Sequence, residues 1–335
     1  ADLGDPRLSG WVALADPRQS GSITTAFESI LSINGWDRGW RILRDMAANA
    51  RYFTNSSTKP PIDVSQGDAA AGVVIDFYGR GQAQAVLAPG QSAADSRVGY
   101  VDPAGEVYID ADPVSIIRGG PSPDLARRFV EFCLTEEAQA LWNLPARESP
   151  ARRAAADAPA LRNPAGDDGR ELGPRTYELR RMPVRRAFYA EHADAMMDKV
   201  DPFALAGKAA STPWRSAIGI MMGAFAIDNF AAMREAWEAL NAARTTPGFP
   251  PDVLAQMEEA FYAWPPTTMP SEGPSGGDAP PRTLPFTQQN YAEIRAAWRR
   301  PGVEARARIE YTQFFAAQYQ RVLELHRGAA LAASR

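Results

Sequence analysis

Short apolar runs alternate with helical patterns along residues 10–105. The runs Val12–Ala15 and Gly72–Ile75 are continuous rather than alternating, which is typical of strands buried on both faces. Between them, Ile23–Ile33 and Trp36–Asn49 carry apolar residues at helical spacing, and an Asn-Gly pair separates the two helices. This order of elements predicts an α/β fold built on an open sheet.

Beyond this stretch the predicted elements become mainly helical. Val98–Tyr108 indicates strand, turn and strand, Val114–Ile117 a further strand, and Pro123–Trp142 a helix. Residues 145–175 and 265–285 are rich in Pro and Gly without periodicity, which predicts loops. Helical spacing recurs in the remaining segments, at residues 214–244, 250–263, 287–299 and 303–327.

Composition excludes several classes of protein. A net charge of −4 over 335 residues gives no basic excess for nucleic acid or an acidic membrane surface. The single cysteine, Cys133, rules out an intrachain disulfide. No apolar run reaches the roughly 18–20 residues that span a bilayer. Phosphate-loop, dinucleotide, nucleophile-elbow and Cys/His patterns are missing, so we expect neither an enzyme nor a cofactor or resident metal.

One turn carries candidate chemistry. The first strand stops at Asp16-Pro17, and a helix begins after Ser20, Gly21 and Ser22. The first turn of a helix has unpaired backbone N–H groups and the positive end of the helix dipole, which together suit an anion. A serine there can also be an ordinary helix cap. Both interpretations stay open on these residues alone.

Two further groups of polar residues follow predicted strands. Asp76 and Tyr78 end the second strand, where alternation places them on one side with Phe77 opposite. Asp76 suits a cationic amine or a metal, or caps the strand end, and Tyr78 suits an anion or lies in water. Ser57 belongs to the polar loop Thr54–Thr58, which either contacts ligand or is an ordinary turn.

Several segments, in this order, resemble the second lobe of extracellular solute-binding proteins of ABC importers, in the branch with ferric-ion and phosphonate binders. They are VALADPRQSGSITTAFESIL, GWDRGWRILRDMAANARYF and VSQGDAAAGVVIDFYGR, and ADPVSIIRGGPSPDLARRFVEFCLTEEAQALW resembles the return to the first lobe. The resemblance covers roughly residues 1–145. Family members begin with a first lobe and a secretion signal, so we expect this chain to lack its N-terminal part.

The resemblance implies a type 2 periplasmic-binding bilobal α/β fold with an extra helical C-terminal region. Residues 10–105 would form the second lobe with a ligand half-site, and 106–145 the return to the first lobe. Residues 146–175 would be a linker, and 176–335 a mostly helical region packed on the first lobe. It also implies a periplasmic or extracellular protein, which we expect to be a monomer, that delivers its ligand to the membrane subunits of an ABC permease.

The resemblance places Ser20, Gly21, Ser22, Ser57, Asp76 and Tyr78 around a small anionic or metal-containing solute. Ferric binders carry two consecutive tyrosines where Phe77 and Tyr78 stand, so one phenolate is missing and iron is not expected. His192 and His326 lack metal-site spacing and are interpreted as packing or surface residues. The alternatives are a sensor or scaffold that does not transport, or an enzyme on the same bilobal fold with Asp76 as base.

Overall fold

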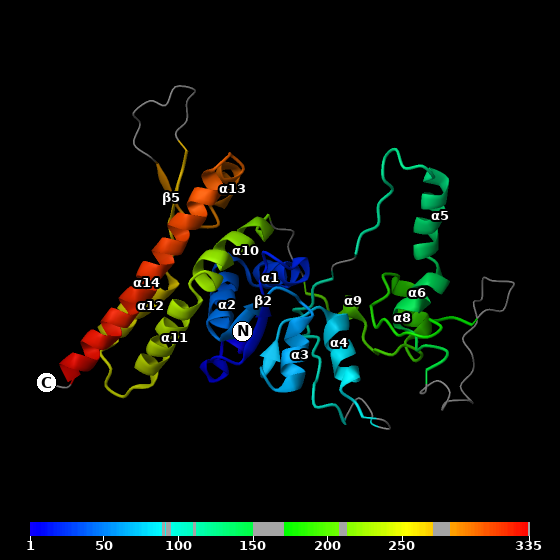
Figure 1. Cartoon of the computed structure of the whole chain (residues 1–335), viewed down its shortest axis with the longest axis horizontal. Coiled ribbons are helices and arrows are strands. Elements are labelled where there is room, and N and C mark those ends of the chain that lie inside the picture. The colour runs from blue at the N-terminus through cyan, green and yellow to red at the C-terminus, as the bar shows by residue number, and fades with distance from the viewer. Residues whose placement is uncertain are drawn as a thin grey trace. The chain divides into compact units, whose positions relative to one another are not determined.

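The computed structural model describes residues 1–88, 91, 95–109, 112–149, 171–207, 213–270 and 282–333 (Figure 1). The chain divides into two compact units. The terminal unit combines Ala1–Ile75 with Ala209–Arg335, and the central unit is Asp76–Lys208.

A small parallel sheet organises the first part of the terminal unit. Strand β1 (Val12–Ala15) lies between β2 (Ala50–Thr54) and β3 (Ala71–Gly72), and both neighbours run parallel to it. All the side chains of β1 are buried, as its continuous apolar run predicted. Two 3₁₀ turns precede the sheet, η1 (Asp2–Gly4) and η2 (Pro6–Leu8).

Helices α1 (Gly21–Asn34) and α2 (Trp36–Ala48) connect β1 to β2, and α3 (Lys59–Gln66) leads from β2 to β3. Gly35 separates α1 from α2 with a φ of 78°, a conformation that suits glycine. Gly39 brings the two helices close together, because a Cβ there would lie 2.8 Å from the Cα of Leu31. Both predicted helices are thus present, with bounds within a few residues of those expected.

The C-terminal helices complete the same core. Apolar side chains from β1, α1 and α2 form one buried cluster with those of the C-terminal segments. In Figure 1, α14 runs beside α11 and α12, and it packs against each of these two helices. The C-terminal elements are α10 (Arg215–Met222), a π-helical turn η4 (Gly223–Ile227), α11 (Phe230–Thr245), α12 (Pro251–Tyr262), β4 (Pro266–Thr268), β5 (Thr283–Pro285), α13 (Tyr291–Trp298) and α14 (Val303–Ala333).

A buried arginine ties α2 to these C-terminal helices. Arg44 is 1 % exposed and donates from Nη1 to the carbonyl oxygens of Phe261, at 2.7 Å, and Ala263, at 3.1 Å. Its guanidinium lies over the rings of Trp264 and Phe315, at 4.2 and 5.0 Å from their centroids. Burial lowers the pKa of Arg44. The pairing of a buried cation with the carbonyls at the end of α12 joins two segments that are far apart in sequence.

The central unit has a smaller core. Leu144, Leu172, Phe188, Tyr189 and Met196 belong to its buried apolar cluster. Helix α5 packs little, and its apolar side chains Leu125, Phe129 and Phe132 are exposed. The helices of this unit are α4 (Asp76–Ala85), α5 (Pro123–Cys133), α6 (Glu136–Asn143), α8 (Arg186–His192) and α9 (Pro202–Leu205).

Three sequence predictions were wrong in this region. The second strand ends at Gly72, and the chain enters α4 at Asp76 instead of continuing as a strand. Within the described residues, Val98–Tyr108 forms a single bridge, between Val107 and Ala206, and Val114–Ile117 forms no strand. Ile116 and Ile117 are exposed there. An apolar run that has no neighbouring strand to pair with is not stable as a strand.

The C-terminal helices belong to the same compact unit as the parallel sheet. The helices after residue 213 share a core with residues 12–50. Of the predicted linker, residues 150–170 lie outside the described residues, as do 271–281 of the second predicted loop. Among the described helices none is long and apolar enough to cross a membrane by itself; only α10–η4 with α11, bent by 70°, has the length and composition together.

Candidate ligand-binding site

The carboxyl ends of β1 and β2 lie next to each other at one edge of the sheet. The amide of Asp16, just after β1, donates to the carbonyl of Thr54 at 2.8 Å. In the order β2-β1-β3, the connection from β1 leads to β2 on one side of β1, and the connection from β2 crosses to β3 on the other side. Open parallel sheets form ligand crevices at such a point, outside the carboxyl ends of the strands. The turn after β1 therefore occupies the expected position for a ligand.

The turn itself is held by an arginine that folds back on it. Asp16 is buried, and its carboxylate accepts from Arg18 Nε at 3.0 Å and Nη2 at 2.9 Å. The remaining guanidinium nitrogen of Arg18 donates to Asp228 at 2.9 Å, just after η4. All three guanidinium nitrogens of Arg18 are therefore hydrogen-bonded within the protein. The hydrogen bonds to the two aspartates raise the pKa of Arg18, and burial opposes this rise. This pairing fixes the start of α1 against the C-terminal helices.

The N-terminus of α1 offers backbone donors. Ser20 is the N-cap residue, and its hydroxyl accepts from the amide of Ile23 at 3.5 Å. The amides of Gly21 and Ser22 have no acceptor among the described residues, and Gly21 is exposed. A Cβ at Gly21 would meet nothing within 4 Å, so there is open space beside the backbone of this residue. Two free N–H groups at the positive end of a helix of 14 residues are suited to an anion.

The predicted serine loop lies at the same edge of the sheet. Ser57 is in the turn that follows β2, and its side chain is half-buried. Ser56 and Thr58 hydrogen-bond to each other through their hydroxyls at 2.8 Å, whereas the Ser57 hydroxyl has no partner among the described residues. The structure therefore places Ser57 and the Ser20–Ser22 turn after neighbouring strands of one sheet.

Asp76 and Tyr78 belong to the central unit and to a helix. Successive helical residues are rotated by about 100°, so the strand alternation that placed Asp76 and Tyr78 together does not apply. Tyr78 is half-buried, and its ring lies 4.3 Å from that of Phe77. The Asp76 carboxylate accepts from Arg80 Nη1 at 3.0 Å. Burial raises the pKa of Asp76, and the charge of Arg80 opposes the rise.

Arg80 is the centre of an ion-pair network that the sequence interpretation missed. Its side chain is 5 % exposed, and besides Asp76 it contacts Asp102 at 2.7 Å and Asp198 at 3.7 Å. Arg180 pairs with Asp198 in turn. Burial alone would lower the pKa of Arg80, but the hydrogen bond to Asp102 and the charges of the three aspartates raise it. The Asp76–Arg80 spacing of four residues was the available signal, because such pairs meet on one face of a helix.

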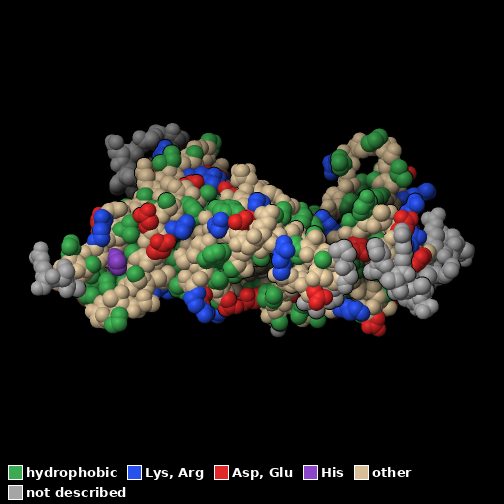
Figure 2. Space-filling model, turned by 60° about the horizontal axis from the view of Figure 1, so that its bottom comes forward, with side chains coloured by type: hydrophobic (Ala, Val, Ile, Leu, Met, Phe, Trp, Pro, Cys, Tyr) green, Lys and Arg blue, Asp and Glu red, His purple; other side chains and the backbone are tan. Residues whose placement is uncertain are grey.

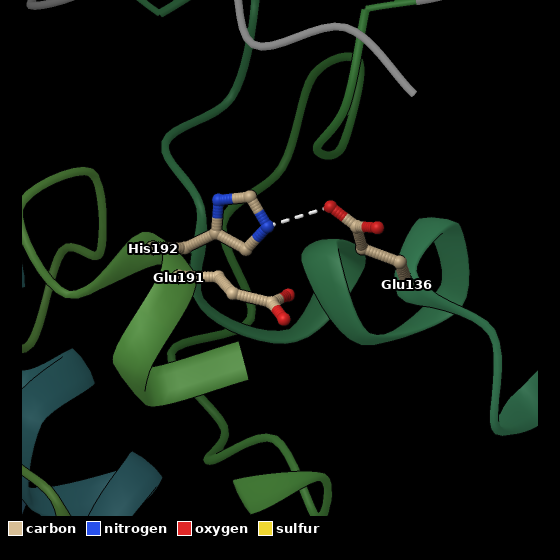
Figure 3. Close-up of side chains that lie close together, drawn as sticks. All are labelled: Glu136, Glu191 and His192. Atoms are coloured by element: carbon tan, nitrogen blue, oxygen red, sulfur yellow. Dashed lines mark hydrogen bonds and ion pairs between the residues drawn. The ribbon is translucent and has the colours of Figure 1, made fainter. Parts of the chain in front are cut away.

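Three further side chains come together at α6 and α8 (Figure 3). Glu136, Glu191 and His192 place carboxylate and imidazole atoms within 4.8 Å of one another. His192 Nε2 lies 2.6 Å from Glu136 Oε1, and the imidazole packs on Phe188 with ring centroids 4.6 Å apart. Ligand atoms of a tetrahedral zinc site are about 3.3 Å apart, given bonds of about 2.0 Å. Glu136 would have to move away to share an ion with His192, so the arrangement is that of a hydrogen-bonded pair.

No sequence pattern indicated this group, since Glu136 is far from Glu191 and His192 along the chain. The other histidine, His326, stacks on Phe249 in the terminal unit with ring centroids 5.9 Å apart. Neither histidine belongs to the sheet edge that carries the candidate site.

Comparison with known proteins defines the class. A family model described as bacterial extracellular solute-binding protein matches residues 1–169, which is half of the chain, and the protein belongs to that family. An uncharacterized protein of Haemophilus influenzae is 29% identical over 145 residues, or 42% of this chain and 38% of that protein. The phosphoglycerate transport regulatory protein PgtC of Salmonella typhimurium is 24% identical over 138 residues, or 41% of this chain and 32% of that protein. The chain thus spans about a third of the length of these relatives.

The description of the family refers to extracellular proteins that bind solutes. The matched residues include the whole sheet and the β1–α1 turn, and they end before the C-terminal helices.

Proposed function

We propose that this protein captures a small anionic solute at the β1–α1 turn, as the substrate-binding component of an ABC import system. The observation that carries the proposal is the pair of open amides at Gly21 and Ser22, at the carboxyl edge of a parallel sheet. Ser57 adds a free hydroxyl on the neighbouring strand end, and Ser20 holds the helix start in place. Asp76 and Tyr78, which belong to the central unit, remain predicted ligand residues.

Iron is disfavoured as the solute. A ferric site needs several hard, ionised oxygens, and here Phe77 stands where a second phenolate would be. The carboxylate of Asp76 already pairs with Arg80, so a cation would have to compete with a guanidinium. The name of PgtC refers to phosphoglycerate, and a phosphorylated or phosphonylated carboxylic acid is the solute class we propose to test first.

A sensor function is the second candidate, and two observations favour it. The name of PgtC describes a regulatory protein, and the C-terminal helices share a core with the solute-binding sheet, so ligand binding at the sheet edge can alter them directly. The enzyme alternative has less support, because its proposed base, Asp76, is paired with Arg80.

A thermal-shift panel tests solute capture. Phosphate, phosphonates, phosphoglycerate, sugar phosphates, polyamines and ferric citrate are compared at matched ionic strength. A ligand that binds only the folded state stabilises it by about 2.7 kcal/mol at 100-fold excess over Kd. We expect stabilisation by a phosphorylated or phosphonate compound; a response confined to polyamines or ferric citrate would overturn the anion proposal.

Uptake measurements separate the two candidates. Cells with and without the gene are supplied with the labelled ligand identified by the panel. Loss of uptake supports the transport function. Unchanged uptake, with a change in transcript levels on addition of ligand, supports the sensor.

A further inference from the structure

A cavity in the terminal unit lies beside the candidate turn but is formed mainly by the C-terminal helices. Its volume is about 400 Å³, a size within the usual range for small-molecule sites. Side chains of α10, α13 and α14 line it together with residues of the β1–α1 region; the lining includes Pro17, Thr24, Arg215, Arg295, Arg299 and Arg308.

The charges around this cavity are unbalanced. Arg308 donates to Glu304 at 2.7 Å, and Arg215 donates to Glu28 at 2.8 Å. Arg295 and Arg299 form no ion pair among the described residues. The two are four residues apart and project from α13 and its C-terminal residue into the same cavity, so their like charges repel each other. Figure 2 shows acidic and basic side chains intermixed on the visible face of the molecule.

The cavity combines these guanidinium groups with an apolar wall. Trp298 and Ile220, both buried, line it together with Gly219 of α10. Guanidinium groups form paired hydrogen bonds with phosphate and carboxylate oxygens, and they hold such groups better than ammonium groups do. The apolar wall suits the carbon skeleton of an organic ligand.

We propose that this cavity binds a small organic anion with at least two negative charges, with a phosphate monoester as the best-matched class. Arg295 and Arg299 hold the anionic group, and Arg215 and Arg308 surround it. Ser20, Gly21 and Ser22 do not line the cavity, and its arginines lie outside the residues that match the family. The inference therefore concerns a second site and does not rest on the proposed function.

Isothermal titration calorimetry tests the proposed anion site in the cavity. The full chain is titrated with pyrophosphate and with glycerol phosphate, each at low and at high salt. The double variant Arg295→Gln/Arg299→Gln is compared with Arg300→Gln, an exposed arginine next to the cavity residues that does not line it. We expect the double variant to bind at least 30-fold more weakly and Arg300→Gln to bind as the parent does. Thermal unfolding of each variant checks that the fold is kept.

Gly21→Val separates this site from the turn. We expect it to leave binding in the cavity unchanged. Loss of binding in Gly21→Val, alone or together with the double variant, would overturn the claim of a separate site. Binding by the double variant within threefold of the parent, or no binding by the parent at low salt, would overturn the site itself.

Discussion

Substituting Gly21 tests the candidate turn most directly. A Cβ at this position meets nothing within 4 Å, so we expect the isopropyl group that Gly21→Val adds to leave the packing of α1 intact. We expect a branched side chain at this position to hinder the approach of an anion to the amides of Gly21 and Ser22. We therefore expect the free energy of unfolding to change by less than about 0.5 kcal/mol, as for an ordinary surface substitution.

The expected loss of binding follows from the two donors. Each hydrogen bond to a charged acceptor contributes about 1.5–3 kcal/mol. Blocking both amides at Gly21 and Ser22 should cost about 3 kcal/mol or more, which is on the order of 100-fold in Kd. Ser22→Ala should cost about 1–2 kcal/mol if its hydroxyl also donates. The assay is isothermal titration with the anion that stabilises the protein most in the thermal-shift panel.

The matched control is Gly328→Val. Gly328 lies in helix α14, and a Cβ there also meets nothing within 4 Å. We expect this variant to bind as the parent does. Full binding by both Gly21→Val and Ser22→Ala would refute the assignment of the anion to the turn.

Three further predictions concern packing, pH and the ligand shell. Gly39→Ala should destabilise the protein by about 1–3 kcal/mol in denaturant unfolding, because its Cβ would lie 2.8 Å from a Cα of α1, whereas Gly328→Ala should be neutral or stabilising. Burial raises the pKa of Tyr262 to about 12, so the contribution of this group to stability is present below pH 10 and is lost between pH 10 and 12. Tyr262→Phe should therefore make the free energy of unfolding fall less steeply over this pH range. An unchanged dependence on pH would contradict the prediction. Tyr78→Phe should weaken binding of the cognate ligand in titrations and His192→Ala should not, and ferric citrate should give no phenolate-to-iron absorption band. A band that disappears in Tyr78→Phe would show that iron binds.

Local patterns in the sequence were sufficient to predict β1 and the two helices that follow it, but they did not indicate β2. Four consecutive apolar residues predicted β1, and helical spacing predicted α1 and α2. The pair Asn34-Gly35 predicted the break between the two helices. These features depend on neighbours within a few residues, and that is why they can be predicted without a structure. The turn at Ser20 was predictable for the same reason.

Tertiary structure decided where distant residues meet. The residues after β3 are compatible with either a strand or a helix. In the structure they form α4, and from this helix Arg80 contacts Asp102 and Asp198, which lie further along the chain. The core shared by α2 and the C-terminal helices depends on Arg44, whose partners lie more than 200 positions away.

The same distinction applies to chemistry. The open amides of α1 follow from the start of a helix, which the sequence itself determines. The cavity with Arg295 and Arg299 and the group of Glu136 with His192 depend on which helices pack together. Such packing is set by the burial of apolar surface over the whole unit. It therefore cannot be predicted from the spacing of residues along the chain.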